Sequence, residues 1–329
     1  MDSYTPPFEI TNAMLSSVSS ISEKLGKIGI IRSFDAKPHL RRNNRIKSVH
    51  ASLKIEANSL SEGTVRAVLN NRAVIGPEKE IQEVKNAFAA YDEISRVDPY
   101  SLEDLRRLHG ILTYLTVEES GVFRKGDEGV FDGDRCIFMA PPPEMVSPLM
   151  HSLFAWMKEN ANTVHPLILS SVFHYEFVFI HPFRDGNGRM ARLWQTILLA
   201  AWNPLFQYIP IESQIEQFQE GYYRAIAVCN ANGSSTEFIE FMLARIDEVL
   251  SDVLTQSSSD GYSSPSIHKL LEAMEYDTAY STSELLSRLN LKSRDSLRNH
   301  YLLPAIEAGL IEMTVPDKPT SRSQRYRKK

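Results

Sequence analysis

A short polar stretch, residues 181–192, carries side chains that could do chemistry together. It reads His-Pro-Phe-Arg-Asp-Gly-Asn-Gly-Arg-Met-Ala-Arg and lies between two mostly apolar stretches, 167–180 and 193–202. Apolar stretches of this length are typical of buried helices, and buried helices can hold a loop in a fixed geometry. Residues 181–192 are therefore the first candidate for a functional site.

The second half of this stretch has the residue types that bind phosphates. Gly186 and Gly188 permit positive φ and close approach of the backbone to a ligand, and Asn187 tolerates the same conformations and can cap a helix. A helix beginning near Gly188 would present free N–H groups at its positive end. Arg189 and Arg192 are three residues apart and would share one helix face, where their guanidinium groups fit phosphate oxygens.

Two further side chains supply a metal ligand and a base. Asp185 is a hard oxygen ligand for Mg²⁺, which usually binds together with phosphates. His181 has the pKa range of a general base. Taken singly, a Gly-Asn-Gly is usually a turn and a lone histidine is usually structural, but here all of these parts occur within twelve residues. Together they predict a nucleotide triphosphate site with a base beside it.

The stretch resembles the signature of the Fic family, H-P-F-x-[D/E]-G-N-G-R-x-x-R, and it matches at every specified position. The surrounding pattern extends over about residues 5–250. Most Fic proteins are all-α enzymes that transfer AMP from ATP to a protein hydroxyl. The resemblance implies an all-α Fic core with a small β-hairpin flap, and a Mg²⁺-dependent protein adenylyltransferase that acts on Ser, Thr or Tyr.

The resemblance also implies a role for each residue of the signature. His181 would deprotonate the target hydroxyl, Asp185 would hold Mg²⁺, and Phe183 would pack into the core and hold the loop. The nucleotide-binding residues would be the Gly-Asn-Gly turn, around the α- and β-phosphates, and two arginines on the outer phosphates: Gly186, Asn187, Gly188, Arg189 and Arg192.

A second motif lies upstream, in a helix predicted to end near Ala57. Ser52 and Glu56 are four residues apart and share a helix face, which by itself fits a solvated polar face. Next to the signature, they resemble the inhibitory motif [S/T]-x-x-x-E-[G/N] of many Fic proteins, whose glutamate pairs with the second signature arginine, here Arg192. Ala57 departs from the motif, because it stands where Gly or Asn is expected, and Asn58 comes one residue later. The resemblance implies autoinhibition by Glu56.

Residues 121–143 differ from the helical patterns around them. Glycines punctuate this stretch, three prolines close it, and short β-prone runs flank Asp132-Gly133-Asp134. This pattern predicts a hairpin. An ordinary surface hairpin is one interpretation. The Fic resemblance implies instead a flap, near residues 129–140, that covers the nucleotide and holds the target protein by strand addition.

Apolar periodicity, capping residues and composition divide the chain into four parts. Residues 1–110 are predicted to form an N-terminal helical region with the inhibitory motif, and residues 111–254 the Fic core. The serine-rich residues 255–265 are predicted to be a linker. Residues 266–329 are predicted to form a second domain.

The second domain is expected to contain three helices, at 266–275, 283–289 and 294–308, followed by a hairpin. This order resembles a winged helix-turn-helix. Its final residues are basic and could contact nucleic-acid phosphates: Arg322, Arg325, Arg327, Lys328 and Lys329. A protein-interaction or dimerisation unit with a solvated tail is an equal alternative, because the third helix has acidic residues as well as basic ones.

Composition sets limits on the whole chain. With 329 residues, 43% of them hydrophobic and 23% charged, it can form one large domain and a small one. The net charge of −5 argues against a general nucleic-acid coat, and Cys136 and Cys229 form neither a disulfide framework nor a metal-ligand spacing. Neither a signal peptide nor a transmembrane segment is apparent, so we expect a cytoplasmic protein with no membrane partner.

Three functions stay open from the sequence. The first is transfer of AMP from ATP to a target protein, with Glu56 as the inhibitor. The second is removal of AMP by the same site, with Glu56 positioning a water, as some Fic proteins with this glutamate do. The third is a nucleotide-sensing regulator that binds DNA through the winged helix. The target, the nucleotide base and the existence of a homodimer are not determined by the sequence.

Overall fold

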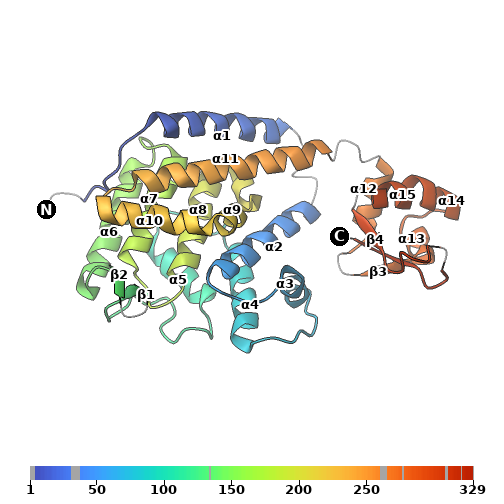
Figure 1. Cartoon of the computed structure of the whole chain (residues 1–329), viewed down its shortest axis with the longest axis horizontal. Coiled ribbons are helices and arrows are strands. Elements are labelled where there is room, and N and C mark those ends of the chain that lie inside the picture. The colour runs from blue at the N-terminus through green and yellow to red at the C-terminus, as the bar shows by residue number, and fades with distance from the viewer. Residues whose placement is uncertain are drawn as a thin grey trace. The chain divides into compact units, whose positions relative to one another are not determined.

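The computed structural model describes residues 4–30, 38–132, 135–259, 265–275, 278–307, 310–319 and 321–328. The chain divides into two compact units, Met1–Leu254 and Thr255–Lys329 (Figure 1). The predicted N-terminal helical region and the predicted core lie together in the first unit, where they share one hydrophobic core. The second unit has a separate core of its own.

The first unit is helical. In chain order it contains α1 (Asn12–Ile30), α2 (Pro38–Ile55), α3 (Glu62–Leu69), α4 (Glu78–Asp92), α5 (Leu102–Leu112), α6 (Pro143–Asn160), α7 (Pro166–Ile180), α8 (Asn187–Trp202), the 3₁₀ turn η1 (Pro204–Tyr208), α9 (Ile211–Gln217), α10 (Gln219–Asn232) and α11 (Thr236–Ser259). Helix α11 continues five residues beyond its predicted end, so the predicted linker begins as helix.

Helices α7 and α8 form the centre of this unit (Figure 1). Nearly every residue of both helices is buried, including Phe173, Phe177 and Trp194. A helix that is buried on all sides needs other helices to cover it all round. The polar residues of the signature lie in the turn between α7 and α8, so two fully packed helices fix both ends of the candidate site.

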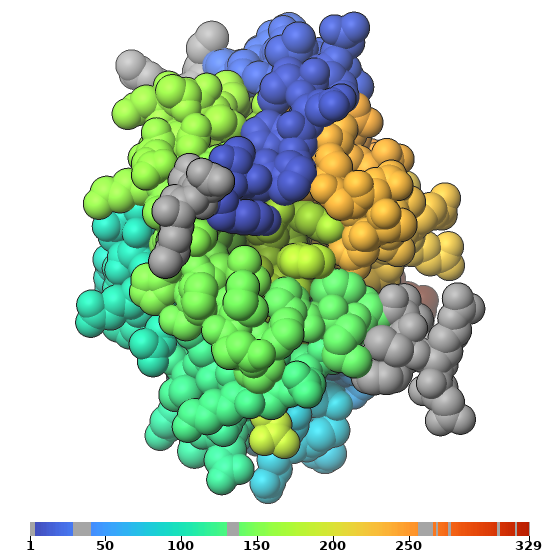
Figure 2. Space-filling view, turned by 90° about the vertical axis from the view of Figure 1, so that its left-hand side faces the viewer, coloured from blue at the N-terminus to red at the C-terminus, as the bar shows by residue number. Residues whose placement is uncertain are grey.

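Helices α1 and α11 lie side by side on the outside of the unit (Figure 1), joined by an ion pair of 2.8 Å between Lys24 and Asp247. The segment before α1 also contacts α11, because the Glu9 amide donates to Thr236 Oγ1 at 2.9 Å. Figure 2 shows this dark blue segment against the orange surface of α11. The first and the last helices of the unit therefore hold each other in place.

A two-stranded hairpin connects α5 to α6, as the sequence predicts. Strand β1 (Gly129–Asp132) pairs with β2 (Arg135–Met139), with Gly129 opposite Met139. The predicted tip, residues 133–134, lies outside the described residues. In the described part of the chain this sheet has two strands, so each strand has one edge without a partner strand.

Two local features are not apparent from apolar spacing. Ile215, Phe218, Tyr222 and Ile226 are spaced as in one helix, but the chain forms α9 and α10 with a break at Phe218, whose φ of −111° and ψ of 36° are not helical. Ser59 and Ser61 both precede the third helix, and the cap is Ser61, whose Oγ accepts from Thr64 N. Apolar spacing alone does not locate such breaks and caps.

The second unit contains short helices and a three-stranded antiparallel sheet. Its elements are α12 (Pro265–Ala273), β3 (Ala279–Ser281), α13 (Thr282–Arg288), α14 (Arg294–Leu297), the π-helical turn η3 (Arg298–Leu302), α15 (Leu303–Glu307), β4 (Ile311–Met313) and β5 (Arg325–Lys328). The strand order is β3-β5-β4. The winged helix-turn-helix arrangement is thus confirmed, with β3 as a strand that was not predicted.

Three of the five basic residues near the C-terminal end are part of this sheet, while Arg322 precedes it and Lys329 lies outside the described residues. These three occupy β5, its middle strand, where Arg325 pairs with Glu284 at 3.5 Å and Arg327 with Glu312 at 3.8 Å. Lys328 Nζ donates to Leu271 O at 2.8 Å, and burial lowers the pKa of Lys328 to about 8. These residues form a strand with intramolecular partners, so they do not form a solvated tail.

The predicted fold class is confirmed: the chain is mainly helical, with a small hairpin in the first unit and a small sheet in the second. Within the described residues, every helix is too short or too polar to traverse a lipid bilayer.

Candidate functional site

The site begins where α7 ends. His181 is the C-cap of α7, with φ of 50° and ψ of 59°, and its amide donates to Phe177 O at 3.0 Å. This left-handed conformation is uncommon for a residue with a side chain and persists only where the surroundings hold it. It turns the chain sharply out of the helix and places the histidine at the start of the loop.

The environment of His181 favours the neutral ring. Nδ1 lies 3.2 Å from Val178 O, so we assign the ring proton to Nδ1, and Nε2 is left as an acceptor. Burial lowers the pKa of His181 below its ordinary value; Arg124 also lowers it, while the Val178 carbonyl, Glu128 and Glu56 partly oppose the shift. At neutral pH the imidazole is therefore unprotonated, as a general base must be.

The loop after His181 is braced from inside. Asn187 uses both ends of its amide on Phe183, because Oδ1 accepts from Phe183 N at 2.9 Å and Nδ2 donates to Phe183 O at 2.6 Å. The Phe183 ring is fully buried, as predicted, and stacks on His109 with 3.6 Å between ring centroids. The Asn187 side chain thus holds the loop, which leaves only its backbone N–H for a phosphate.

His109 fixes the same loop from α5. Its Nε2 donates to Asp185 O at 2.9 Å, and its Nδ1 accepts from Gly121 N at 2.9 Å. The two bonds together define one neutral tautomer. Burial lowers the pKa of His109 to about 4, so the ring stays neutral at physiological pH.

Glycine is needed at positions 186 and 188 for different steric reasons. Gly186 is the N-cap of α8, has a φ of 82° and offers no side chain to the first N–H groups of the helix. A helix start without a side-chain cap is suited to bind an anion. A Cβ at Gly188 would lie 2.2 Å from Glu56 Oε1, so only glycine permits Glu56 to approach α8 here.

Asp185 is the one acid of residues 181–192, and 45% of its side chain is exposed. Its Oδ1 accepts from Arg189 Nη2 at 2.9 Å, and its Oδ2 lies 4.0 Å from Lys79 Nζ. In the described part of the chain, no three His, Cys, Asp or Glu side chains are grouped as metal ligands. An exposed carboxylate beside an anion site nevertheless fits Mg²⁺, which commonly binds through one or two carboxylates together with phosphate oxygens.

Arg192 is held by the residues of the upstream motif. Its side chain is 1% exposed; Nε donates to Ser52 Oγ at 3.1 Å and Nη2 donates to Ser52 O at 2.9 Å. Nη2 also donates to Glu56 Oε1 at 2.7 Å. Ser52 and Glu56 thus both contact Arg192, although α2 ends one residue before Glu56.

Ala57 explains the preference of the inhibitory motif for Gly or Asn. Helix α2 ends with two bonds, Ala57 N to Lys54 O at 3.0 Å and Asn58 N to Leu53 O at 3.1 Å, and Ala57 has a φ of 63°. This bond pattern is a Schellman ending, in which the left-handed residue is usually glycine and sometimes asparagine. The mismatch therefore keeps the backbone geometry and adds local strain.

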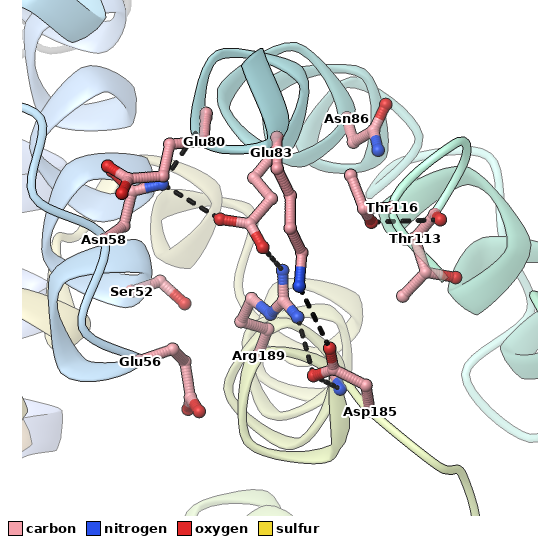
Figure 3. A network of polar contacts seen from close by, with 12 residues as sticks. Ser52, Glu56, Asn58, Glu80, Glu83, Asn86, Thr113, Thr116, Asp185 and Arg189 are labelled. Carbon is pink, nitrogen blue, oxygen red and sulfur yellow. Dashed lines mark hydrogen bonds and ion pairs between the residues drawn. The ribbon is translucent and has the colours of Figure 1, made fainter. Parts of the chain in front are cut away.

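Arg189 is held by a second glutamate, which the sequence did not indicate. Its Nη1 lies 3.2 Å from Glu83 Oε1, and Glu83 in turn accepts from Asn58 Nδ2 at 3.0 Å. Figure 3 shows Glu83 reaching from α4 to Arg189 of α8, with Asp185 on the other side. Only 12% of the Glu83 side chain is exposed. Both signature arginines are therefore paired with acids of this chain.

The structure brings the sequence-predicted site residues together around the N-terminal end of α8. Those in the loop and in α8 are His181, Asp185, Gly186, Asn187, Gly188, Arg189 and Arg192, and those reaching it from the end of α2 are Ser52 and Glu56. Sequence reasoning missed three residues that contact them, Glu83, His109 and Arg124, and a fourth, Asn58, that contacts Glu83. None has a motif of its own, and Arg124 is followed directly by Lys125, so its spacing gives no signal either.

Comparisons with known proteins agree with this arrangement. A sequence model of the Fic/DOC family matches residues 99–199, and one described as "Filamentation induced by cAMP protein Fic-like, C-terminal domain" matches residues 265–328. Two curated relatives are named protein adenylyltransferases. The one from Aedes aegypti is 30% identical over 207 residues, covering 60% of this chain and 39% of the relative. The one from Caenorhabditis elegans is 27% identical over 247 residues, covering 71% and 45%.

This chain therefore spans less than half the length of those two relatives. A solved structure of a Fic domain containing signaling protein from Bacteroides thetaiotaomicron shares the fold, with a TM-score of 0.62, 19% identity, and coverage of 74% of this chain and 98% of that one. A Fic family protein from Desulfovibrio desulfuricans is 41% identical, with a TM-score of 0.75 and coverage of 99% of this chain and 98% of that one. The chain belongs to the Fic family.

Proposed function

We propose that this chain is a protein adenylyltransferase that transfers AMP from ATP to a hydroxyl side chain of a target protein, with Mg²⁺ as cofactor. The observation that supports this most is the placement of a neutral His181 at the end of α7, one short turn before the uncapped N-terminus of α8. A base beside an anion site is the arrangement that nucleotidyl transfer to a hydroxyl requires.

In the proposed reaction the target oxygen attacks the α-phosphorus of ATP. His181 Nε2 takes the hydroxyl proton as the new O–P bond forms; the bond from the α-phosphorus to the bridging oxygen breaks, and pyrophosphate leaves. The N–H groups of Gly186, Asn187 and Gly188 and the two arginines would bind the phosphates. Mg²⁺, held by Asp185 and the phosphates, would neutralise charge on the leaving group.

The target would bind at the hairpin, residues 129–140. A segment of the target can add to an edge of β1 or β2 through backbone hydrogen bonds, because each strand has an edge without a partner in the described residues. Backbone pairing positions a hydroxyl without selecting a particular sequence.

Glu56 would inhibit transfer through Arg192. While Glu56 Oε1 accepts from Arg192 Nη2 at 2.7 Å, that donor is not available to an outer phosphate. The carboxylate also lies against Gly188, so it places negative charge at the anion site. With these contacts in place, ATP would bind poorly for reaction.

Glu83 would add to this inhibition through Arg189. Asn58, two residues after Glu56, donates to Glu83 Oε2, so one short turn contacts both acid–arginine pairs. Displacing that turn would loosen both pairs together. The two arginines would then bind phosphates in the same step.

The test compares transfer of label from ATP labelled on the α-phosphate and from ATP labelled on the γ-phosphate, using the Glu56→Gly variant and wild type. We expect label on protein from the α-phosphate and none from the γ-phosphate, more strongly in the variant, and an AMP adduct by mass spectrometry. Equal label from both positions, or labelling only from the γ-phosphate, would contradict AMP transfer.

Removal of AMP is a second candidate, favoured by one observation. Of the two carboxylate oxygens of Glu56, Oε1 accepts from Arg192, and 36% of the Glu56 side chain is exposed, so Oε2 would be able to orient a water. Release of AMP from a modified target by wild type, lost in Glu56→Gly, would support this function. A DNA contact of the second unit and a homodimer stay predictions. Two of the arginines expected to contact nucleic-acid phosphates, Arg325 and Arg327, are paired with acids.

A further inference from the structure

Arg124 is a buried arginine outside the signature that bonds to backbone carbonyls. It lies between α5 and β1 and is 4% exposed. Nε donates to His181 O at 2.7 Å, Nη1 to Gly126 O at 2.8 Å, and Nη2 to Pro141 O at 2.5 Å and Ile180 O at 3.3 Å. Among the described residues no carboxylate forms an ion pair with it. The guanidinium therefore joins three separate segments of backbone.

The first of these segments is the end of α7. Ile180 and His181 contribute carbonyls that have no partner within the helix, and a cation at a helix C-terminus is favoured by the dipole. The amide of Arg124 also donates to Pro182 O at 2.9 Å. Bonds to three successive carbonyls, 180–182, hold His181 in its left-handed conformation, which does not persist without such support.

The other two segments are the ends of the hairpin. Gly126 precedes β1, and Pro141 follows β2. The hairpin is closed nearby by Ala140 N, which donates to Glu128 O at 3.0 Å. One guanidinium thus fixes both ends of the hairpin relative to the residue that would act as the base.

We infer that Arg124 is a positioning residue that sets the distance between the His181 ring and a hydroxyl presented by a target bound at the hairpin. This inference rests on the proposed function. If the target binds by strand addition, the hairpin places the hydroxyl and α7 places the base, and Arg124 is the side chain bonded to both. A misplacement of about 1 Å at a reacting centre can cost on the order of 10²-fold in rate.

Arg124→Lys is the informative variant. Lysine keeps the positive charge, but it has a single terminal nitrogen instead of a planar guanidinium. That nitrogen cannot reach the carbonyls of all three backbone segments at once. Arg106→Lys is the matched control. Arg106 Nε donates to Gly121 O at 3.1 Å, and its guanidinium lies 5.4 Å from the Phe123 ring centroid. Arg106 therefore supports the connection from α5 to β1, and within the described residues it bonds to neither α7 nor the hairpin.

The experiment measures self-modification, which is transfer of AMP to the enzyme itself, by Glu56→Gly chains that carry either lysine variant. It covers a range of ATP concentrations. For Arg124→Lys we expect the maximal rate to fall about 10- to 100-fold, with the half-saturating ATP concentration changed by less than about twofold. For Arg106→Lys we expect both values within about twofold of the parent. A normal maximal rate in Arg124→Lys, an equal loss in Arg106→Lys, or a loss confined to ATP affinity overturns the inference.

A second readout does not need transfer. In Arg124→Lys, and in Arg124→Gln as a second variant, hydrogen exchange of the hairpin amides 129–139 and of the loop 181–186 should accelerate together, with the rest of the unit unchanged. Unchanged exchange in either folded variant, or acceleration of one segment only, contradicts the coupling. If Glu56→Gly itself transfers no AMP, the proposed function fails, and exchange still decides whether Arg124 joins hairpin and base.

Discussion

The two sides of the candidate site are held by different kinds of contact. On the phosphate side, residues 186–192, the arginines are paired with carboxylates from other parts of the chain, Glu56 and Glu83. On the base side, residues 181–183, the loop is held by hydrogen bonds to its backbone, from Arg124 and from Asn187. The first set joins opposite charges, whereas the second satisfies backbone groups.

This difference indicates which side can change during function. A phosphate can replace a carboxylate on an arginine, because both are anions with oxygen acceptors of similar geometry. If a ligand displaced an intramolecular donor from a buried carbonyl, that carbonyl would lose its hydrogen bond, which costs about 1–3 kcal/mol. We therefore expect the phosphate side to be adjustable and the base side to be fixed.

The largest effect is expected on the base side, from His181→Ala. Loss of a general base typically lowers the rate by about 10²–10⁴-fold. ATP affinity should be nearly unchanged, because His181 is assigned to proton removal and not to phosphate binding. Transfer rates in the Glu56→Gly background, together with calorimetric ATP binding, check this. A folded His181→Ala chain with parental transfer would remove His181 from the role of base.

The next effect is expected on the phosphate side, from Glu56→Gly. If the pair with Arg192 biases the site by about 1.4–2.8 kcal/mol, its removal should raise self-modification about 10- to 100-fold. The double variant Glu56→Gly with Arg192→Ala should fall back, since the arginine that was released is absent. Equal rates in wild type and Glu56→Gly would mean that Glu56 does not inhibit.

Glu83→Gln should have a smaller effect in the same direction. The amide keeps the shape and the contact with Asn58 but removes the charge opposite Arg189, which still has Asp185 as a partner. We expect self-modification to rise about two- to fivefold, equivalent to about 0.4–1 kcal/mol. Added to Glu56→Gly, the change should be non-additive, because Asn58 connects the two pairs. Full additivity would show that the pairs are independent.

The smallest effect is expected from Ala57→Gly, and it should have the opposite sign. Glycine removes the strain of a φ of 63°, which costs an L-residue about 1 kcal/mol. The turn that carries Glu56 becomes more stable, so self-modification should fall by up to about fivefold and the thermal midpoint should rise slightly. Higher activity in Ala57→Gly would show that the strained turn does not weaken inhibition.

Much of the site could be predicted from the sequence, because its residues are adjacent in the chain. Gly186 at the start of α8, Arg189 and Arg192 on one helix, and the buried Phe183 all follow from local spacing and residue type. The pairing of Glu56 with Arg192 spans 136 positions, and it was expected only because of a resemblance to other Fic proteins.

Other contacts could not be predicted because they depend on packing between distant elements. Glu83 is one acid among several on α4, and nothing in its spacing indicates that it faces Arg189. The left-handed conformation of His181 is not encoded by a glycine, since bonds from Arg124 to backbone carbonyls support it. Residue type and spacing indicate what a side chain can do, but the partner that fixes it comes from tertiary structure.

The position of Glu56 in the chain also determines the order in which the parts of the site are made. Glu56 precedes Arg192 by 136 residues, so at about 5–20 residues per second it leaves the ribosome about 7–27 s earlier. Under the proposed mechanism, every newly synthesised chain already contains its inhibitory residue when its catalytic loop first folds. Inhibitor and active site are also produced in a fixed ratio of one to one, so fluctuations in expression cannot generate an excess of uninhibited enzyme.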